Sequence, residues 1–165
     1  MNRILLFTVI LVLAVGGGYL VARPFSEVVQ PIAFNHKVHI DNGLDCSACH
    51  ERYSQAAVAG RPKLTTCLFC HETPLTESPE EEKVRQYAER GEEIPWRRLT
   101  RLPAHVYFSH RRHVVLGGIA CQTCHGHIGQ STSPPSRPEI QLKMNDCLAC
   151  HRQHGVTTDC NACHR

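Results

Sequence analysis

The sequence predicts a mostly irregular fold with short α-helices and one N-terminal transmembrane helix. Three observations lead to this prediction. The chain begins with a long run of uncharged residues, and all ten cysteines fall into copies of one five-residue motif. Only ten of the 165 residues are aromatic (five Phe, four Tyr and one Trp), while twelve are histidine. A core in a domain of this size normally uses more large apolar side chains, so we expect something else to fill the interior.

The N-terminal helix is predicted from residues 4–22, which are nineteen positions without a charge after Arg3. That length is about enough to cross a bilayer as a helix. A cleaved signal peptide is the alternative, but residues 20–22 (Leu-Val-Ala) form a poor cleavage site and three glycines lie inside the run. We therefore expect residues 1–22 to be a membrane anchor or, less favoured, a signal peptide. Residues 23–165 would form one domain outside the cell membrane, because Arg3 favours an inside N-terminus.

The cysteines form five C-x-x-C-H motifs, and none is left over. Ten cysteines would suggest disulfides in a secreted chain and zinc in a cytosolic one, so their spacing has to decide. Five pairs cannot be divided evenly among four-ligand zinc sites, and a redox disulfide has no use for the repeated histidine. The pairs are Cys46 and Cys49, Cys67 and Cys70, Cys121 and Cys124, Cys147 and Cys150, and Cys160 and Cys163.

This spacing suits covalent attachment of haem. Two thiols three positions apart on a helical turn can reach the two vinyl groups of a haem and form thioethers. The next residue then points its imidazole at the iron as the proximal ligand. The sequence therefore predicts five haems c that serve as the apolar core, with a short helix at each motif. The predicted proximal ligands are His50, His71, His125, His151 and His164.

The other axial position of each iron needs a second donor. The chain has only two methionines, Met1 and Met144, so at most one haem could have His/Met ligation. Bis-histidine ligation is therefore the default, which favours low-potential iron that exchanges electrons and has little room for a substrate. Seven histidines are available: His36, His39, His105, His110, His113, His127 and His154.

An internal repeat assigns four of these histidines. The segment F-x-H-x-x-H occurs at residues 34–39 and again at 108–113, each time before a C-x-x-C-H motif with a second motif downstream. The repeats cover about residues 31–75 and 105–155, and the fifth motif follows them. The two imidazoles of one segment lie about one helical turn apart, so they can serve neighbouring haems. We predict His36, His39, His110 and His113 as distal ligands.

The fifth distal ligand stays open between two histidines. His154 lies six residues before Cys160, much as His39 lies seven before Cys46, whereas His105 stands just before the second repeat. His127, in a Cys-His-Gly-His sequence, is expected to be a surface residue. Met144 is expected to pack against a porphyrin.

The chain resembles the class III multihaem cytochromes c. The resemblance rests on the F-x-H-x-x-H and C-x-x-C-H pattern and covers about residues 31–165. Residues 94–99 (I-P-W-R-R-L), 102–110 (L-P-A-H-V-Y-F-S-H) and 121–126 are also similar to the pentahaem cytochrome subunits of alternative complex III and of related quinone reductase complexes. This resemblance implies a membrane-anchored subunit on the periplasmic side. Its partners would be quinone-reacting membrane subunits, an iron–sulfur subunit and a soluble cytochrome.

The remaining segments are expected to connect the haem motifs. Ser78 as N-cap, a first-turn proline and three glutamates predict a helix from Pro79 to Arg90 that Gly91 closes. Three prolines predict a loop over residues 131–138. The formal charge of +3 omits the haem propionates, so the loaded protein is expected to be net negative. Five arginines form a sequence cluster that suits propionates or an acidic partner, and no nucleic-acid motif accompanies it: Arg97, Arg98, Arg101, Arg111 and Arg112.

Three functional classes follow from these features. The favoured one is an electron relay within a membrane oxidoreductase complex, or docked to one. A freestanding quinol-oxidising cytochrome or periplasmic shuttle is the second. The third is a multihaem enzyme, which needs an iron with an open face. Enough histidines are present to close every site, so the sequence predicts an electron-transfer protein and no catalytic residues.

Overall fold

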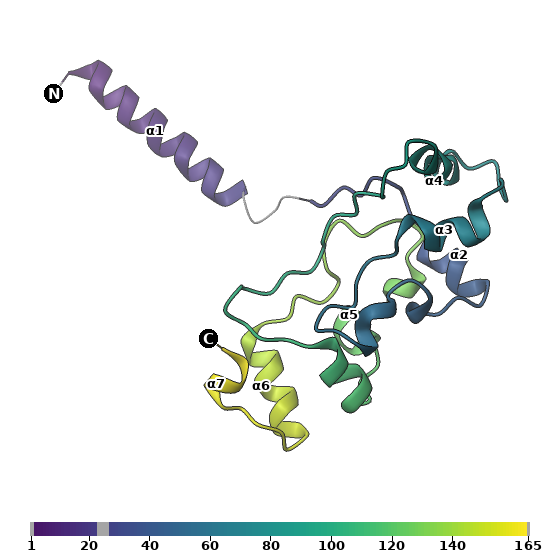
Figure 1. The fold of residues 1–165 in the computed structure, drawn as a ribbon. Coiled ribbons are helices and arrows are strands. Elements are labelled where there is room, and N and C mark those ends of the chain that lie inside the picture. Colours follow the sequence, from purple (N-terminus) through teal and green to yellow (C-terminus); the bar gives the residue numbers. More distant parts are fainter. Residues whose placement is uncertain (1, 23–26, 165) are drawn as a thin grey trace.

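The computed structural model describes residues 2–22 and 27–164, and for residues 20–22 only the backbone. Helix α1 (Arg3–Ala22) stands apart from a domain of short helices joined by long irregular segments (Figure 1). The described part of the domain has no strand, only an isolated antiparallel bridge between Val106 and His164. The predicted mostly irregular, short-helix fold is confirmed.

Apolar side chains of α1 are exposed along its described length, with Phe7 72% and Val12 70% accessible. Within residues 2–22 and 27–164, no helix has both the length and the hydropathy that crossing a membrane requires. The predicted transmembrane helix is therefore not found among these residues. The predicted boundary between residues 22 and 23 falls on residues 23–26, which lie outside the described part of the chain.

The motifs lie on short helical segments, as predicted. The first motif begins the 3₁₀-helix η2 (Cys46–Ala48), and η3 (Glu51–Ser54) follows it. The second ends α3 (Leu64–His71), the third lies at α5 (Gln122–His125), the fourth within α6 (Met144–Gln153), and the fifth on α7 (Cys160–Cys163).

Helix α4 (Pro79–Glu89) follows the predicted capping pattern. The Ser78 side chain accepts a hydrogen bond from the Glu80 N–H, and three glutamates occupy the first turn. Gly91 has a φ of +64°, the left-handed conformation that ends helices and that glycine adopts without strain. The helix is one residue shorter than predicted, since Arg90 is its C-cap. Residues 131–138 contain neither helix nor strand, as predicted.

The side-chain core is small. Four hydrophobic side chains are buried in the described part of the chain, and they form one cluster under α3 and α4. No described side chain falls below 2% exposure. Protein interiors are normally close-packed, so this polypeptide by itself leaves most of the domain without a core. The cluster consists of Ile32, Leu64, Val84 and Ile94.

The two repeats dock reciprocally. Helix α2 (His36–Asp41) of the first repeat packs against η5 (Ile128–Gln130), which follows the third motif. The π-helix η4 (Arg111–Leu116) of the second repeat packs against η3, which follows the first motif. Backbone hydrogen bonds fix both contacts, from Lys37 N–H to the Ser131 carbonyl (3.0 Å) and from His110 N–H to the Ala57 carbonyl (3.0 Å). Each repeat thus holds the histidine-bearing element of the other.

Glu81 fastens α4 to the end of α3. Glu81 is 8% exposed, and its carboxylate accepts hydrogen bonds from the N–H groups of Leu75 (2.7 Å) and Thr76 (2.8 Å). Arg85 donates a further bond of 3.0 Å. The Thr76 hydroxyl, then the Leu75 N–H, and then Arg85 and His71 hold the pKa of Glu81 far below its ordinary value.

Replacing Glu81 with glutamine is expected to lower Tm by roughly 5 °C at pH 7, because two backbone N–H donors and Arg85 lose a charged acceptor. A carboxyl whose pKa is depressed on folding stabilises the protein above its unfolded pKa of about 4.3, and this contribution is lost as the pH falls. The difference in Tm between wild type and Glu81→Gln should therefore become smaller below about pH 4 in thermal unfolding scans. Glu82→Gln, on the exposed side of the same helix, is the matched control and should shift Tm little. A gap of constant size from pH 7 to pH 3 would contradict this assignment.

Candidate haem sites

The five motifs define sites 1 to 5, numbered along the chain by their proximal histidines. At four of these sites, the ring of one other histidine lies close to the ring of the motif histidine, as the distances between the two ring centroids show. These distances are 6.1 Å for His39 and His71 at site 2, 6.3 Å for His110 and His125 at site 3, 6.2 Å for His113 and His151 at site 4, and 5.5 Å for His105 and His164 at site 5.

At site 1, His36 lies near His50. Burial, and then the imidazoles of His50 and His39, lower the pKa of His36. The pKa of His125 is lowered in the same way, first by burial and then by His110 and His50. A lowered pKa keeps an imidazole neutral at physiological pH, which is the form that binds a metal.

The ring spacing fits a shared iron atom. Two imidazoles on opposite sides of one iron would have centroids about 6 Å apart, given a metal–nitrogen bond of about 2.0 Å and roughly 1.1 Å from nitrogen to ring centre. Three of the pairs have centroid distances close to that value, at 6.1, 6.2 and 6.3 Å. The residues present therefore fit a bis-histidine haem at each of these sites.

Hydrogen bonds at Nδ1 orient many of these rings. Backbone carbonyls accept from Nδ1 of five of the histidines at 2.7–2.9 Å, and a donating Nδ1 leaves the lone pair of Nε2 free for a metal. His36 Nδ1 instead lies 3.2 Å from the Ser131 hydroxyl. At His71, Nδ1 is 3.3 Å from the Glu81 carboxylate, within ion-pair distance but outside hydrogen-bond geometry. The carbonyl pairs are His39 with Asn35, His50 with Gly60, His110 with Ala57, His113 with Ser109, and His151 with Thr157.

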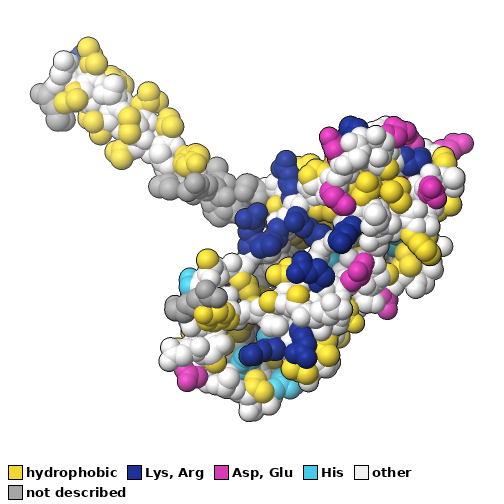
Figure 2. Space-filling view, viewed as in Figure 1, with side chains coloured by type: hydrophobic (Ala, Val, Ile, Leu, Met, Phe, Trp, Pro, Cys, Tyr) yellow, Lys and Arg dark blue, Asp and Glu magenta, His cyan; other side chains and the backbone are white. Residues whose placement is uncertain are grey.

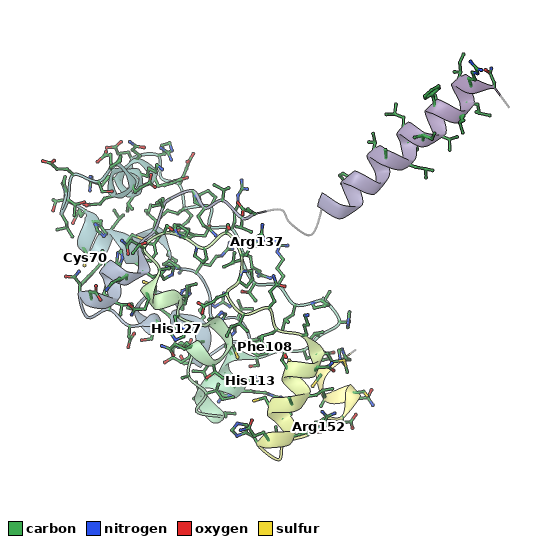
Figure 3. All side chains as sticks on the ribbon, turned by 180° about the vertical axis from the view of Figure 1, so that it is seen from behind. Cys70, Phe108, His113, His127, Arg137 and Arg152 are labelled. Carbon is green, nitrogen blue, oxygen red and sulfur yellow. The ribbon has the colours of Figure 1, made fainter. Side chains whose placement is uncertain are left out.

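The repeated phenylalanine has the same role in both repeats. Phe34 stacks on His39 at 4.3 Å and meets His36 edge-on at 4.8 Å. In the second repeat Phe108 stacks on His113 at 4.5 Å and meets His110 edge-on at 4.9 Å. Figure 3 shows Phe108 beside His113. The F-x-H-x-x-H pattern thus packs one aromatic ring between two imidazoles and limits their rotation.

The ten cysteines are free thiols in the structure. Burial raises the pKa of Cys67 to about 11, with Cys49 and Glu93 adding to the effect. Burial also raises the pKa of Cys46, and the Cys121 thiol adds to it through a direct contact. Thiols with raised pKa are uncharged at neutral pH and suit an apolar porphyrin edge.

His105 and His154, the two candidates for the fifth distal ligand, lie in different surroundings. His105 stacks on His164 at 5.5 Å, next to the bridge between Val106 and His164. His154 is the exposed C-cap of α6. His127 is exposed, as expected, and lies 3.4 Å from Glu139 through Nδ1. Met144 is 56% exposed at the start of α6, and its packing against a porphyrin stays a prediction.

Sequence reasoning missed the turn after the third motif. Gly126 is buried with a φ of +67°, and a Cβ there would lie 2.3 Å from the Glu139 carboxyl carbon. Glu139 accepts a hydrogen bond of 2.8 Å from the His127 N–H. The signal was the sequence Cys-His-Gly-His, in which the glycine ends α5.

Replacing Gly126 with alanine is expected to destabilise the loaded protein by about 2 kcal/mol, because left-handed strain adds to the loss of the Glu139 hydrogen bond when that flexible carboxylate moves away from the new methyl group. Gly118→Ala is the control, since Gly118 has a φ of +62° but open space around it. The free energy of unfolding of that variant should fall by about 1 kcal/mol, from backbone strain alone. Equal losses in denaturant titrations of the two variants would show that the Glu139 contact is unimportant.

Part of the predicted arginine cluster lines a hollow of about 820 Å³. Arg97, Arg98 and Arg101 are joined there by Arg61 and Trp96. Figure 2 shows basic side chains gathered on this face of the domain. Arg111 and Arg112 belong to η4 instead.

Comparisons with known proteins agree on one class. Residues 106–165 match the family described as cytochrome c7 and related cytochrome c. Residues 21–93 match the class III cytochrome c family. The multihaem cytochrome c subunit of menaquinone reductase from Nitratidesulfovibrio vulgaris is 34% identical over 161 residues, an alignment that covers 84% of this chain and 77% of the relative.

Proposed function

This chain belongs to the class III-like multihaem cytochromes c, and from that premise we propose that it relays electrons through five haems c within a quinone reductase complex. It is an electron-transfer protein rather than an enzyme, and its cofactor is haem c. The number of haems, the ligands and the complex are the parts that we propose.

In this proposal the ten cysteines form thioethers, and each motif histidine is a proximal ligand. The haem supplies an iron that alternates between two oxidation states. The protein's own residues hold the porphyrins, keep the imidazoles neutral and orient them through Nδ1. The distal ligands are His36, His39, His110, His113 and His105, so the fifth ligand is His105 rather than His154.

The observation that carries the proposal is the pairing of histidines. Every proximal histidine has a distinct second histidine beside it, and four of these pairs have ring centroids 5.5–6.3 Å apart. A solvated or core histidine has no reason to lie beside a C-x-x-C-H motif at this spacing four times. Filled axial positions favour electron exchange over substrate binding.

We further propose that the chain works at the membrane, with its haem domain on the periplasmic side. The exposed apolar side chains of α1 need a cover of lipid or of another subunit. The relative is named as a subunit of menaquinone reductase, which supports quinone-reacting membrane subunits as partners. An iron–sulfur subunit and a soluble cytochrome would complete the electron path, as the family resemblance suggests.

The test is a mass measurement of the full chain from a host that attaches haem c. We expect the polypeptide mass plus five haems, with residues 1–22 retained and the protein in the membrane fraction. Replacing both cysteines of any one motif with serine should remove one haem. A colourless product or bound zinc would refute the proposal. A mature N-terminus near Arg23 would instead support a periplasmic shuttle.

Uptake of carbon monoxide by the reduced protein tests the axial ligands separately. Five closed irons should bind almost none. Uptake of one equivalent or more by the wild-type protein would indicate an open iron face and favour a catalytic role.

A further inference from the structure

We propose that electrons pass through the sites in the order 2–1–3–4–5, so that sites 2 and 5 are the two points of exchange with partners. This inference rests on the proposed function and concerns its route. The order differs from the chain order, because sites 1 and 2 exchange places.

Sites 1 and 3 form the centre. The elements that follow them, η3 and η5, each pack against the histidine-bearing element of the other repeat. The His110 ring lies beside His125 of site 3, and its Nδ1 donates a hydrogen bond to the carbonyl of Ala57. Ala57 comes seven residues after His50 of site 1. The Cys46 thiol of site 1 contacts the Cys121 thiol of site 3. Haems attached through these two thiols would therefore be neighbours.

Sites 2 and 4 lie outward from this centre. His36 of site 1 and His39 of site 2 project from the same short helix, α2, three residues apart. His110 of site 3 and His113 of site 4 are related in the same way at η4. The two histidines of each F-x-H-x-x-H segment therefore connect one central site with one outer site. Cys49 of site 1 also lies near Cys67 of site 2, and Cys150 of site 4 near Cys124 of site 3.

Site 5 extends the path beyond site 4. Helices α6 and α7 lie side by side at the C-terminal end of the domain in both ribbon views (Figures 1 and 3). The Cys163 thiol lies near Cys147 of site 4, and the Tyr107 N–H donates to the Cys163 carbonyl at 2.8 Å. Figure 3 places Cys70 of site 2 and Arg152 of α6 at opposite ends of the domain.

Exposure separates the two central sites from the other three. One cysteine is exposed at each of sites 2, 4 and 5, whereas all four cysteines of sites 1 and 3 are partly buried. A one-electron donor at one end would reduce the terminal iron, and each transfer then oxidises one iron as it reduces the next. A one-electron acceptor at the other end removes the electron, so the chain returns to its starting state.

The test opens one site at a time in the loaded protein. His36→Gly should open site 1 to carbon monoxide, and His39→Gly, on the same helix, should open site 2. Carbon monoxide holds an open iron in its reduced form, which makes reduction of its immediate neighbours harder through charge repulsion. We expect NMR-resolved redox titrations to show lowered potentials at two other sites in His36→Gly and at one in His39→Gly.

The opposite result, one neighbour for site 1 and two for site 2, would show that electrons follow the chain order and would overturn the path. His110→Gly, in the second repeat, tests the same path if the α2 pair fails to fold, because it should open site 3. Lowered potentials at sites 1 and 4 would support the path, and lowered potentials at sites 2 and 4 would overturn it. Unchanged exclusion of carbon monoxide in all three variants would refute the distal ligands of the proposed function, and the path with them.

Discussion

Replacing Cys121 and Cys124 with alanine is expected to remove one haem and to lower the stability of the domain by on the order of 5 kcal/mol or more. Site 3 lies at the centre, where η5 and α2 meet and where Cys121 contacts Cys46. Losing a buried group larger than tryptophan should cost at least as much as the 3–5 kcal/mol of a large-to-small core substitution. Domains are stable by only about 5–15 kcal/mol, so the variant should be mostly unfolded or molten.

Thermal unfolding followed by far-UV circular dichroism measures this loss, with haem content measured on the same sample. Cys160→Ala with Cys163→Ala is the matched control, because it also removes one haem but from the exposed C-terminal site. We expect that control to keep a cooperative transition with a Tm within about 10 °C of wild type. If the two double variants are equally stable, the centre of the domain does not depend on site 3.

Replacing His105 with methionine is expected to raise the potential of one haem by on the order of 0.2 V, because His/Met ligation stabilises reduced iron. The structure places the His105 ring 5.5 Å from His164, while His154 caps the end of α6 on the surface. His154→Met is therefore the control and should leave every potential unchanged. Spectroelectrochemical titration would resolve the shifted component. A shift in His154→Met alone would reverse the assignment of the fifth ligand.

Features encoded by short sequence patterns could be predicted. Helix α4 follows from Ser78, Pro79 and Gly91, since capping and helix termination are local effects. The motif helices and the loop at residues 131–138 follow from spacing and composition. The distal role of the four repeat histidines remains a prediction, which the ring pairs support.

Features that depend on distant segments could not be predicted. The position of the His105 ring beside His164 depends on a bridge between Val106 and His164, which no local pattern signals. The carbonyls of Ala57, Gly60 and Thr157 accept hydrogen bonds from histidine rings because of how the loops run, and any residue type could supply these carbonyls. Spacing along the chain likewise gave no reason to place site 1, rather than site 2, beside site 3.

The reciprocal docking of the repeats affects how they can evolve. His36 is oriented by Ser131 of the second repeat, and His110 by Ala57 of the first. Two copies that arose by duplication would therefore have lost their independence once each came to orient a predicted iron ligand of the other. Deleting either copy, or exchanging it for one from a distant homologue, would disturb one of these histidines in the copy that remains, so the two are expected to be inherited and to diverge as a unit.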